Sequence, residues 1–338
     1  MNYNMRNIDA HKRVQWGLIF LVSVTFLISQ ESFAAERKAL TWGTTASTSG
    51  AFVYFVTAAK ILNEKIPEIN LTVRATGGGV HNLRLLEKNE IDIGAVDLKA
   101  AWEAIHGEGV FKGKPFPDLR ALYVNTTNPY NVVVSEKSGI KDIYGLEGKP
   151  FTPGGMGSST EAIAMDILRI LGIHPKIRHS SMADALEAMK NGVIVGWGKT
   201  GISDSMILET MSVMKIRILS FTDEDINNIL KNSVGLKKFV VPAGTYPGVQ
   251  EYKTTTNLFT DFVRKDFPAE LAYKIVKTIW ENRAEIAKHT NPGFLGDRIV
   301  EETLEIDTNY LHPGAIKYYR ELGQKVPRIL LPPEMGEK

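Results

Sequence analysis

Cysteine is absent from the 338-residue sequence, which excludes disulfides, a thiolate nucleophile and cysteine ligands for a metal. Histidine is scarce, and the seven histidines show no metal-ligand spacing. The net charge is only +2 and no basic stretch stands out, which argues against nucleic acid as a partner. The sequence has neither a phosphate-binding loop nor a Gly-x-Ser-x-Gly turn. We therefore expect no metal, no cofactor and no enzymatic activity.

Long hydrophobic runs are also lacking, apart from one near the N-terminus. Two basic residues precede an apolar run over residues 16–29, and small residues follow it. This is the pattern of a secretory signal peptide, and the run is shorter than the ~20 residues that span a bilayer. We expect a signal peptide over residues 1–35, cleaved near Ala34 or Ala35, and no stable membrane insertion afterwards; an uncleaved anchor is the alternative. An exported chain without a cysteine to carry a lipid is expected in a periplasm.

Hydrophobic spacing beyond residue 35 predicts alternating strands, loops and helices. The first block is predicted as strand, loop, helix, strand, turn, helix and strand over 40–43, 44–50, 52–62, 69–74, 77–79, 80–86 and 91–96. The second block is predicted as strand, loop, two helices and two strands over 131–135, 154–159, 160–171, 182–190, 193–197 and 216–220. Two more helices are expected over 268–289 and from 313. Such repeats predict parallel sheets with crossover helices, and the length suggests two domains.

Two loops of small and hydroxyl-bearing residues carry the functional prediction. Residues 44–50 and 154–159 each lead from the end of a strand into a helix, which is where α/β sheets bind ligands. Backbone N–H groups at a helix start, together with serine and threonine hydroxyls, can donate to the oxygens of an anion. The alternative is that these residues only cap their helices. For the glycines at 77–79, a tight turn is the simpler explanation.

Six segments, in this order, carry a family resemblance. They are WGTTASTSGAFVYFVTAAKILNE (42–64), VRATGGGVHNLRLLEKNEIDIGAV (73–96), the region 119–149, GGMGSSTEAIAMDILRILGI (154–173), VPAGTYPG (241–248) and LHPGAIKYYRELG (311–323). Together they resemble the TAXI solute receptors of tripartite TRAP transporters. The resemblance implies an α/β type II periplasmic-binding-protein fold, in which two domains joined by two crossover strands close on a ligand. We assign these domains to residues 36–125 plus 241–338 and to residues 126–240.

The resemblance also implies a non-enzymatic receptor that passes a small carboxylate-bearing solute to a TRAP-type membrane permease. The solute would be a glutamate-like amino acid or a dicarboxylate. Carried over by position, the implied ligand-binding residues are Thr44, Ser47, Thr48, Gly50, Tyr54, Gly157, Ser158, Ser159 and Thr160. Two other functions stay open: a periplasmic sensor component that reports its ligand to a membrane kinase, and an enzyme on the same fold.

Four further residues need interpretation, and three of them have two possible roles each. Asp97 and Lys199 depart from the family pattern, and we include both among the ligand-binding candidates. Asp97 can bind a ligand ammonium group or cap the helix that follows, and Lys199 can pair with a ligand carboxylate or lie solvated on the surface. Trp197 can stack on a ligand or fill the core, and core is the preferred reading. His312 is best explained as a polar residue at a helix start before a proline.

Overall fold

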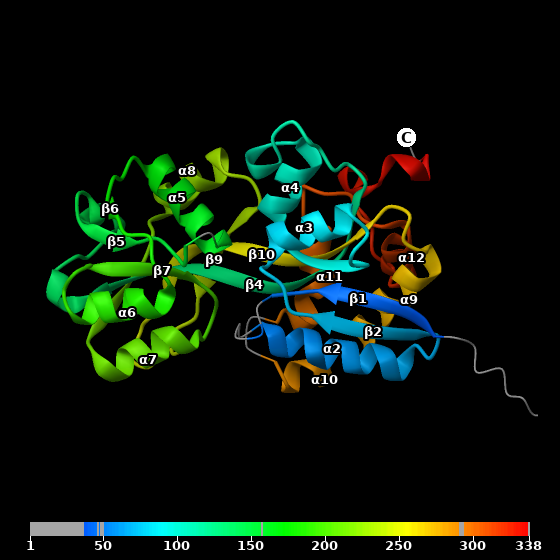
Figure 1. The fold of residues 1–338 in the computed structure, drawn as a ribbon, viewed down its shortest axis with the longest axis horizontal. Coiled ribbons are helices and arrows are strands. Elements are labelled where there is room, and N and C mark those ends of the chain that lie inside the picture. The colour runs from blue at the N-terminus through cyan, green and yellow to red at the C-terminus, as the bar shows by residue number, and fades with distance from the viewer. Residues whose placement is uncertain (1–36, 46, 48–50, 157, 291–293, 337–338) are drawn as a thin grey trace, which may run out of the picture. The chain divides into compact units, whose positions relative to one another are not determined.

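The computed structural model describes residues 37–336 apart from 46, 48–50, 157 and 291–293. The predicted signal peptide therefore lies outside the described residues. Residues 39–338 form one compact unit in which strands and helices alternate (Figure 1). Within the part of the chain that the structure describes, no helix is both long and apolar enough to span a membrane.

Ten strands of the described residues form one connected sheet in the order β2-β1-β3-β10-β4-β7-β5-β6, with β8 also paired to β4 and β9 to β10. Their bounds are β1 Lys38–Gly43, β2 Ile69–Arg74, β3 Ile93–Asp97, β4 Leu119–Ser135, β5 Pro150–Thr152, β6 Lys176–Ile177, β7 Gly196–Thr200, β8 Ile216–Leu219, β9 Leu236–Val241 and β10 Tyr252–Arg264. β1 pairs with β3, and β5 with β6 and β7, in parallel. β10 is antiparallel to both β3 and β4. The predicted parallel pairing is thus confirmed at both ends of the sheet, while its centre is antiparallel.

Helices cover both faces of the sheet, with α3 and α4 on one face and α2 and α10 on the other (Figure 1). The helices are α2 Phe52–Lys65, α3 Gly79–Glu87, α4 Leu98–His106, α5 Ser159–Leu171, α6 Met182–Lys190, α7 Ser205–Val213, α8 Asp223–Asn232, α9 Ala269–Glu281, α10 Arg283–Lys288, α11 Ile299–Leu304 and α12 Pro313–Glu321. Side-chain oxygens of Asp97, Ser158, Ser181, Asp204 and Thr222 accept first-turn N–H groups of α4 to α8. These caps satisfy backbone donors that have no partner inside a helix, and so fix where each helix begins.

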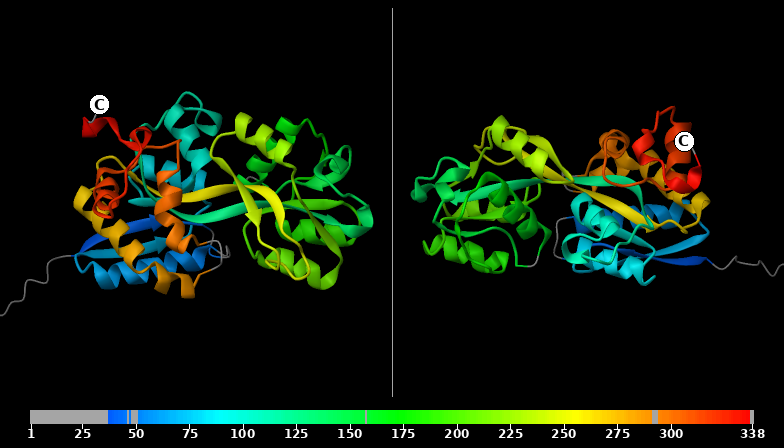
Figure 2. Two further views of the ribbon diagram at one scale, coloured as in Figure 1. Left: turned by 180° about the vertical axis from the view of Figure 1, so that it is seen from behind. Right: turned by 90° about the horizontal axis from the view of Figure 1, so that it is seen from above.

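The hydrophobic interior consists of separate clusters, and the boundary between them crosses two strands, β4 and β10. The first cluster contains buried residues between 40 and 124 and between 258 and 330. The second and third clusters contain buried residues between 130 and 252. The division therefore falls between Val124 and Tyr130 on β4 and between Tyr252 and Leu258 on β10. These two strands pair over nine register positions and run side by side between the two groups of helices (Figure 2).

The helices predicted over 52–62, 80–86, 160–171 and 182–190 are confirmed. The helix predicted over 268–289 is wrong at its middle, because α9 ends before Asn282 and α10 begins after it. The Asn282 side chain donates to the carbonyl of Thr278 at 2.8 Å, a local hydrogen bond that competes with helix continuation.

Two strand predictions also differ from the structure. The strand predicted over 193–197 lies three residues later, as β7, because Val193 is 56% exposed in the turn that follows α6. The strand predicted over 131–135 is only the end of the 17-residue β4.

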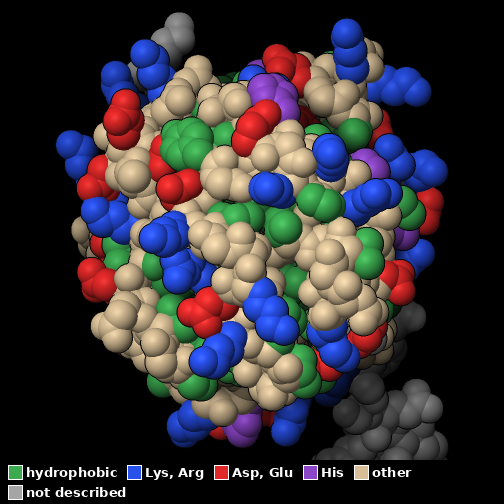
Figure 3. Space-filling view, turned by 90° about the vertical axis from the view of Figure 1, so that its left-hand side faces the viewer, with side chains coloured by type: hydrophobic (Ala, Val, Ile, Leu, Met, Phe, Trp, Pro, Cys, Tyr) green, Lys and Arg blue, Asp and Glu red, His purple; other side chains and the backbone are tan. Residues whose placement is uncertain are grey.

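One face of the molecule, at the end where β5, β6, α6 and α7 lie, is seen in Figure 3. Lysine and arginine side chains are interspersed there with acidic side chains and with small hydrophobic areas. Such mixing is typical of a solvated surface rather than of a surface with a single strong charge.

Candidate functional site

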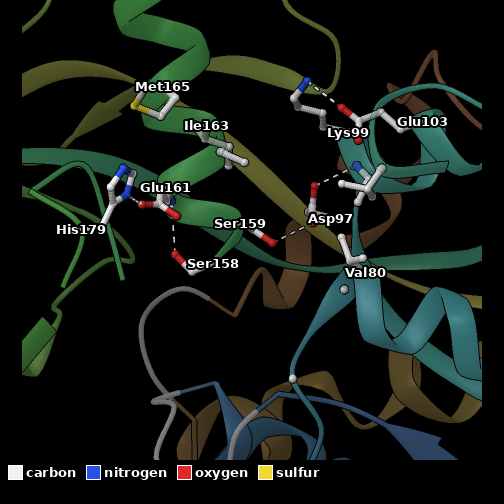
Figure 4. Close-up of a pocket in the computed structure, with 15 residues that line it drawn as sticks. Val80, Asp97, Lys99, Glu103, Ser158, Ser159, Glu161, Ile163, Met165 and His179 are labelled. Carbon is white, nitrogen blue, oxygen red and sulfur yellow. Dashed lines mark hydrogen bonds and ion pairs between the residues drawn. The ribbon is translucent and has the colours of Figure 1, made fainter. Parts of the chain in front are cut away.

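A cleft of about 440 Å³ lies between α3 and α4 on one side and α5 on the other (Figure 4). The buried residues of α3 and α4 belong to the first hydrophobic cluster, whereas those of α5 belong to the second. The cleft lies where β3 runs into α4 and where the loop after β5 enters α5, which is the usual ligand position in α/β sheets. Its charged and hydroxyl side chains are Asp97, Lys99, Glu103, Ser158, Ser159, Glu161 and His179.

Asp97 ends β3 and is the N-cap of α4. Its Oδ1 accepts the N–H of Ala100 at 3.0 Å, and its Oδ2 accepts the hydroxyl of Ser159 at 3.3 Å across the cleft. The residue is 3% exposed, and burial raises the pKa of its carboxyl, while these two hydrogen bonds act in the opposite direction. Among the described residues, no lysine or arginine nitrogen lies within 4.0 Å of this carboxylate. The capping reading of Asp97 is confirmed, and the same side chain also lines the cleft.

Lys99 is the one lysine among the residues described as lining the cleft, and its charge is engaged by acidic neighbours. Its Nζ is 3.0 Å from a carboxylate oxygen of Glu103 on the same helix. A second contact, at 3.8 Å, joins it to Asp166 of α5. This ion pair connects α4 with α5 beside the cleft. With Asp97, Glu103 and Glu161 as carboxylates against one lysine, the lining has a formal charge of −2 when His179 is neutral.

The other wall of the cleft is the first part of α5. Ser158 caps this helix by accepting the N–H of Glu161 at 3.2 Å. The Glu161 carboxylate lies 2.6 Å from Nδ1 of His179, which follows β6. Ile163 and Met165 add apolar surface next to these polar groups (Figure 4). The wall therefore offers a helix N-terminus and the Ser158 hydroxyl to an anionic group, next to an apolar strip.

Three of the residues predicted to bind a ligand line this cleft: Asp97, Ser158 and Ser159. The structure places Thr44 in the interior, where its hydroxyl is 3.1 Å from the backbone carbonyl of Arg74 and joins the ends of β1 and β2. Ser47 is exposed and is not among the residues that line the cleft. The predictions for Thr48, Gly50 and Gly157 lie outside the described residues.

Thr160 and Lys199 make contacts beside the cleft rather than in its described lining. The hydroxyl of Thr160 is 2.7 Å from that of Thr200, and this contact ties the first turn of α5 to the end of β7. Lys199 has its Nζ 3.8 Å from a carboxylate oxygen of Asp204, the N-cap of α7. Trp197 is fully buried in the third hydrophobic cluster, which confirms its core reading.

Tyr54 belongs to a buried polar network instead of the cleft lining. Its hydroxyl is 3.0 Å from that of Tyr123, and its ring packs edge-on against Trp42. Nearby, Asp261 accepts hydrogen bonds from Nε1 of Trp42 at 2.9 Å and from Nδ2 of Asn125 at 2.7 Å. Burial raises the pKa of Asp261 to about 7. The network joins β1, α2, β4 and β10 inside the first cluster.

Sequence reasoning did not select the other lining residues of the cleft, among them Gly79, Lys99, Glu103, Glu161 and His179. Glu103 stands one turn beyond Lys99 on α4, so helical spacing from Lys99 would have found it. His179 follows the short parallel strand β6, so the strand-end rule would have found it as well. Among the described residues, no group of three or more histidine, cysteine, aspartate or glutamate side chains could hold a metal ion.

Comparison with known proteins identifies a family and a fold. Residues 43–323 match the model of the NMT1-like family. The chain is similar to XAC2383 from Xanthomonas citri bound to ATP, with 11% identity over 86% of this chain and 98% of that chain, at a TM-score of 0.52. It is also similar to a Streptococcus mutans structure concerning glutathione import via GshT and the cystine importer TcyBC, with 13% identity over 78% and 98% of the two chains, at a TM-score of 0.50.

A further similar structure is the periplasmic aliphatic sulphonate binding protein SsuA from Escherichia coli, with 16% identity over 86% of this chain and 90% of that chain, at a TM-score of 0.47. The strand order and the two similarities with TM-scores of 0.52 and 0.50 confirm the expected fold, which is the α/β type II periplasmic-binding-protein fold.

Proposed function

Because the chain belongs to the NMT1-like family, we propose that it is an extracytoplasmic solute receptor whose cleft binds a small carboxylate-bearing compound. One observation carries this proposal: the cleft separates helices of two hydrophobic clusters and opens at the N-terminus of α5. At about 440 Å³, it has the size that small-molecule sites usually have. No reacting group is needed, because reversible binding is the whole task.

The carboxylate of the solute would bind at the start of α5. The first N–H groups of a helix have no partner within the helix and carry the positive end of its dipole. The hydroxyl of Ser158 lies at the same place and lines the cleft, whereas the hydroxyl of Ser159 donates to Asp97. Met165, 41% exposed, provides apolar contact for the rest of the solute.

Closure would bring the two walls together around the solute. We propose two domains, residues 36–125 with 241–338 and residues 126–240, which turn about β4 and β10 where the hydrophobic clusters separate. Two contacts already join α4 to α5, namely Asp97 with Ser159 and Lys99 with Asp166. A solute that adds contacts on both sides would favour the closed arrangement by its higher affinity for it.

Delivery to a membrane permease completes the proposed role. The segments that resemble TAXI receptors favour a permease of the TRAP type, and the predicted signal peptide favours a periplasmic location. The similar Streptococcus mutans structure is described in terms of glutathione import, which is also the uptake of a small solute.

A thermal-unfolding screen of the chain without residues 1–35 tests the proposal. The compounds are the amino acids, dicarboxylates, 2-oxo acids and sulfonates. A solute at 100 times its dissociation constant adds about 2.7 kcal/mol of stability and raises the melting temperature by several degrees. If no compound raises it, and mass spectrometry of the denatured protein finds no bound solute, the receptor function is refuted.

Two serine variants then test the position of the site. Ser158→Ala removes a cap and a cleft hydroxyl. Ser181→Ala removes the cap of α6 and a hydrogen bond to Asp184, both outside the cleft, and the two cap bonds have the same length of 3.2 Å. We expect both to lose about 1 kcal/mol of stability. Only Ser158→Ala should also weaken binding of the solute found in the screen, by about 1–3 kcal/mol in calorimetry. Equal affinities in the two variants would remove Ser158 from the site.

A further inference from the structure

The charges of the cleft restrict the kind of solute beyond the presence of a carboxylate. Its described lining contains three carboxylates and one lysine, and that lysine is 3.0 Å from Glu103 and 3.8 Å from Asp166. No charged side chain is added by the loop residues that the structure does not describe, which are 46, 48–50 and 157. A solute with two carboxylates therefore finds no uncommitted lysine or arginine for its second one.

Asp97 is the carboxylate best placed to meet a positive group of the solute. Each carboxylate oxygen can accept about two hydrogen bonds. Each oxygen of Asp97 accepts one of these hydrogen bonds: Oδ1 from the backbone N–H of Ala100, and Oδ2 from the hydroxyl of Ser159. Figure 4 shows Asp97 and Ser159 directed toward each other across the cleft.

A glycine lies close to Oδ2 of Asp97. A Cβ atom at position 79 would lie 3.0 Å from this oxygen, closer than side chains normally approach. Gly79 and Asp97 both line the cleft, so a side chain at position 79 would crowd Oδ2 on the cleft side. An ammonium group in this position would meet the Asp97 carboxylate and the Ser159 hydroxyl together. A buried carboxylate without a cation is costly, and a bound ammonium group would supply the missing partner.

We propose that Asp97 determines specificity, and that the cleft takes a solute bearing an ammonium group in addition to its carboxylate. This inference rests on the proposed receptor function and favours amino acids over dicarboxylates, the two solute classes that the family resemblance implies. The solute carboxylate would bind at the start of α5, and the ammonium group would bind between Gly79, Asp97 and Ser159. A dicarboxylate without an ammonium group would meet the negative charge of Asp97 and be rejected.

Matched pairs of compounds test this inference on the unmodified protein. Each amino acid is compared, by calorimetry, with the acid that lacks only the amino group, for example L-glutamate with glutarate and L-alanine with propionate. We expect the tightest binder to be an amino acid, and its deaminated partner to bind about 10- to 100-fold more weakly, as for loss of a hydrogen bond to a charged group. Equal affinities within a pair, or tightest binding of a dicarboxylate, would overturn the inference and leave the receptor function standing.

The variant Asp97→Asn tests the assigned residue. Asparagine is an equally good N-cap, so α4 keeps its start while the charge is lost. The preference for the amino acid over its deaminated partner should fall to within about threefold. The control is Asp142→Asn, which changes another capping aspartate outside the cleft and should keep the full preference.

If Asp97→Asn unfolds cooperatively, and so is folded, but keeps the full preference for the amino acid over its deaminated partner, Asp97 is excluded as the determinant of specificity. If the unmodified protein binds nothing in the panel and carries no bound solute, the receptor function fails and this inference fails with it.

Discussion

Replacing Asp261 with asparagine should remove a pH dependence from the stability of the chain. Asp261 is fully buried on β10, where it accepts hydrogen bonds from Trp42 and Asn125. Burial raises its pKa from an ordinary value of 3.8 to about 7 in the folded chain. In the unfolded chain the carboxyl is hydrated and keeps its ordinary pKa. Between these two values, the folded chain binds more protons than the unfolded chain.

The free energy of unfolding therefore falls as the pH rises through this range. The contribution of Asp261 is fully present below its unfolded pKa of 3.8 and is lost as the pH rises through about 7. A difference of about three between the two pKa values corresponds to about 4 kcal/mol. Asparagine does not ionise, so the variant lacks this contribution. It also leaves one of the two donors without an acceptor, which costs about 1–3 kcal/mol at every pH.

Urea unfolding of both proteins, followed by tryptophan fluorescence, measures the effect. The variant should be less stable at about pH 5, and its deficit should shrink by about 2.7 kcal/mol by about pH 8.5. Other titrating groups are the same in both proteins and cancel in this comparison. A deficit that is constant over this range would mean that Asp261 titrates with its ordinary pKa in the folded chain, and the reasoning would be refuted.

Three other variants test single contacts. Burial lowers the pKa of His312 from 6.5 to about 4, so the free energy of unfolding should fall by up to about 3 kcal/mol as the pH drops through this range. His312→Asn should flatten this pH dependence in urea unfolding, and an unchanged dependence of stability on pH would contradict the prediction. Tyr54→Phe should cost about 1 kcal/mol of stability without changing solute affinity, and a tenfold loss in calorimetry would return Tyr54 to the binding site. Gly314→Ala would place a methyl group directly against the carbonyl of Ala269, and should cost about 1–3 kcal/mol in thermal unfolding; an unchanged melting temperature would contradict this contact between α12 and α9.

The sequence predicted the parts of the site that depend on local chemistry. Ser158 and Asp97 each stand between a strand and a helix, where the capping role and a position at the sheet edge follow from the same few residues. These two predictions needed no knowledge of distant contacts. The same rule, applied to the end of β6, would have added His179.

Other parts depend on contacts that spacing does not reveal. Tyr54 follows the predicted loop by one helical turn, but so does the core residue Phe55, and only the packed structure places both away from the cleft. The sequence pattern made no prediction for the threonines at 254–256, and all three are buried on β10. Their neighbours are β9 and also β4, where Thr256 pairs with Pro129 and the hydroxyl of Thr254 donates to the carbonyl of Tyr130, more than a hundred residues away in the sequence.

The position of β10 also has a consequence for how the chain acquires its structure. The second and third hydrophobic clusters use residues between 130 and 252, a continuous stretch that can fold once it is made. The first cluster has to wait for residues 258–330, because β10 enters the sheet between β3 and β4. Until then, both strands present unpaired edges, which favour association with other chains. We expect the late addition of β10 to limit the folding rate, and chains that end before residue 252 to aggregate.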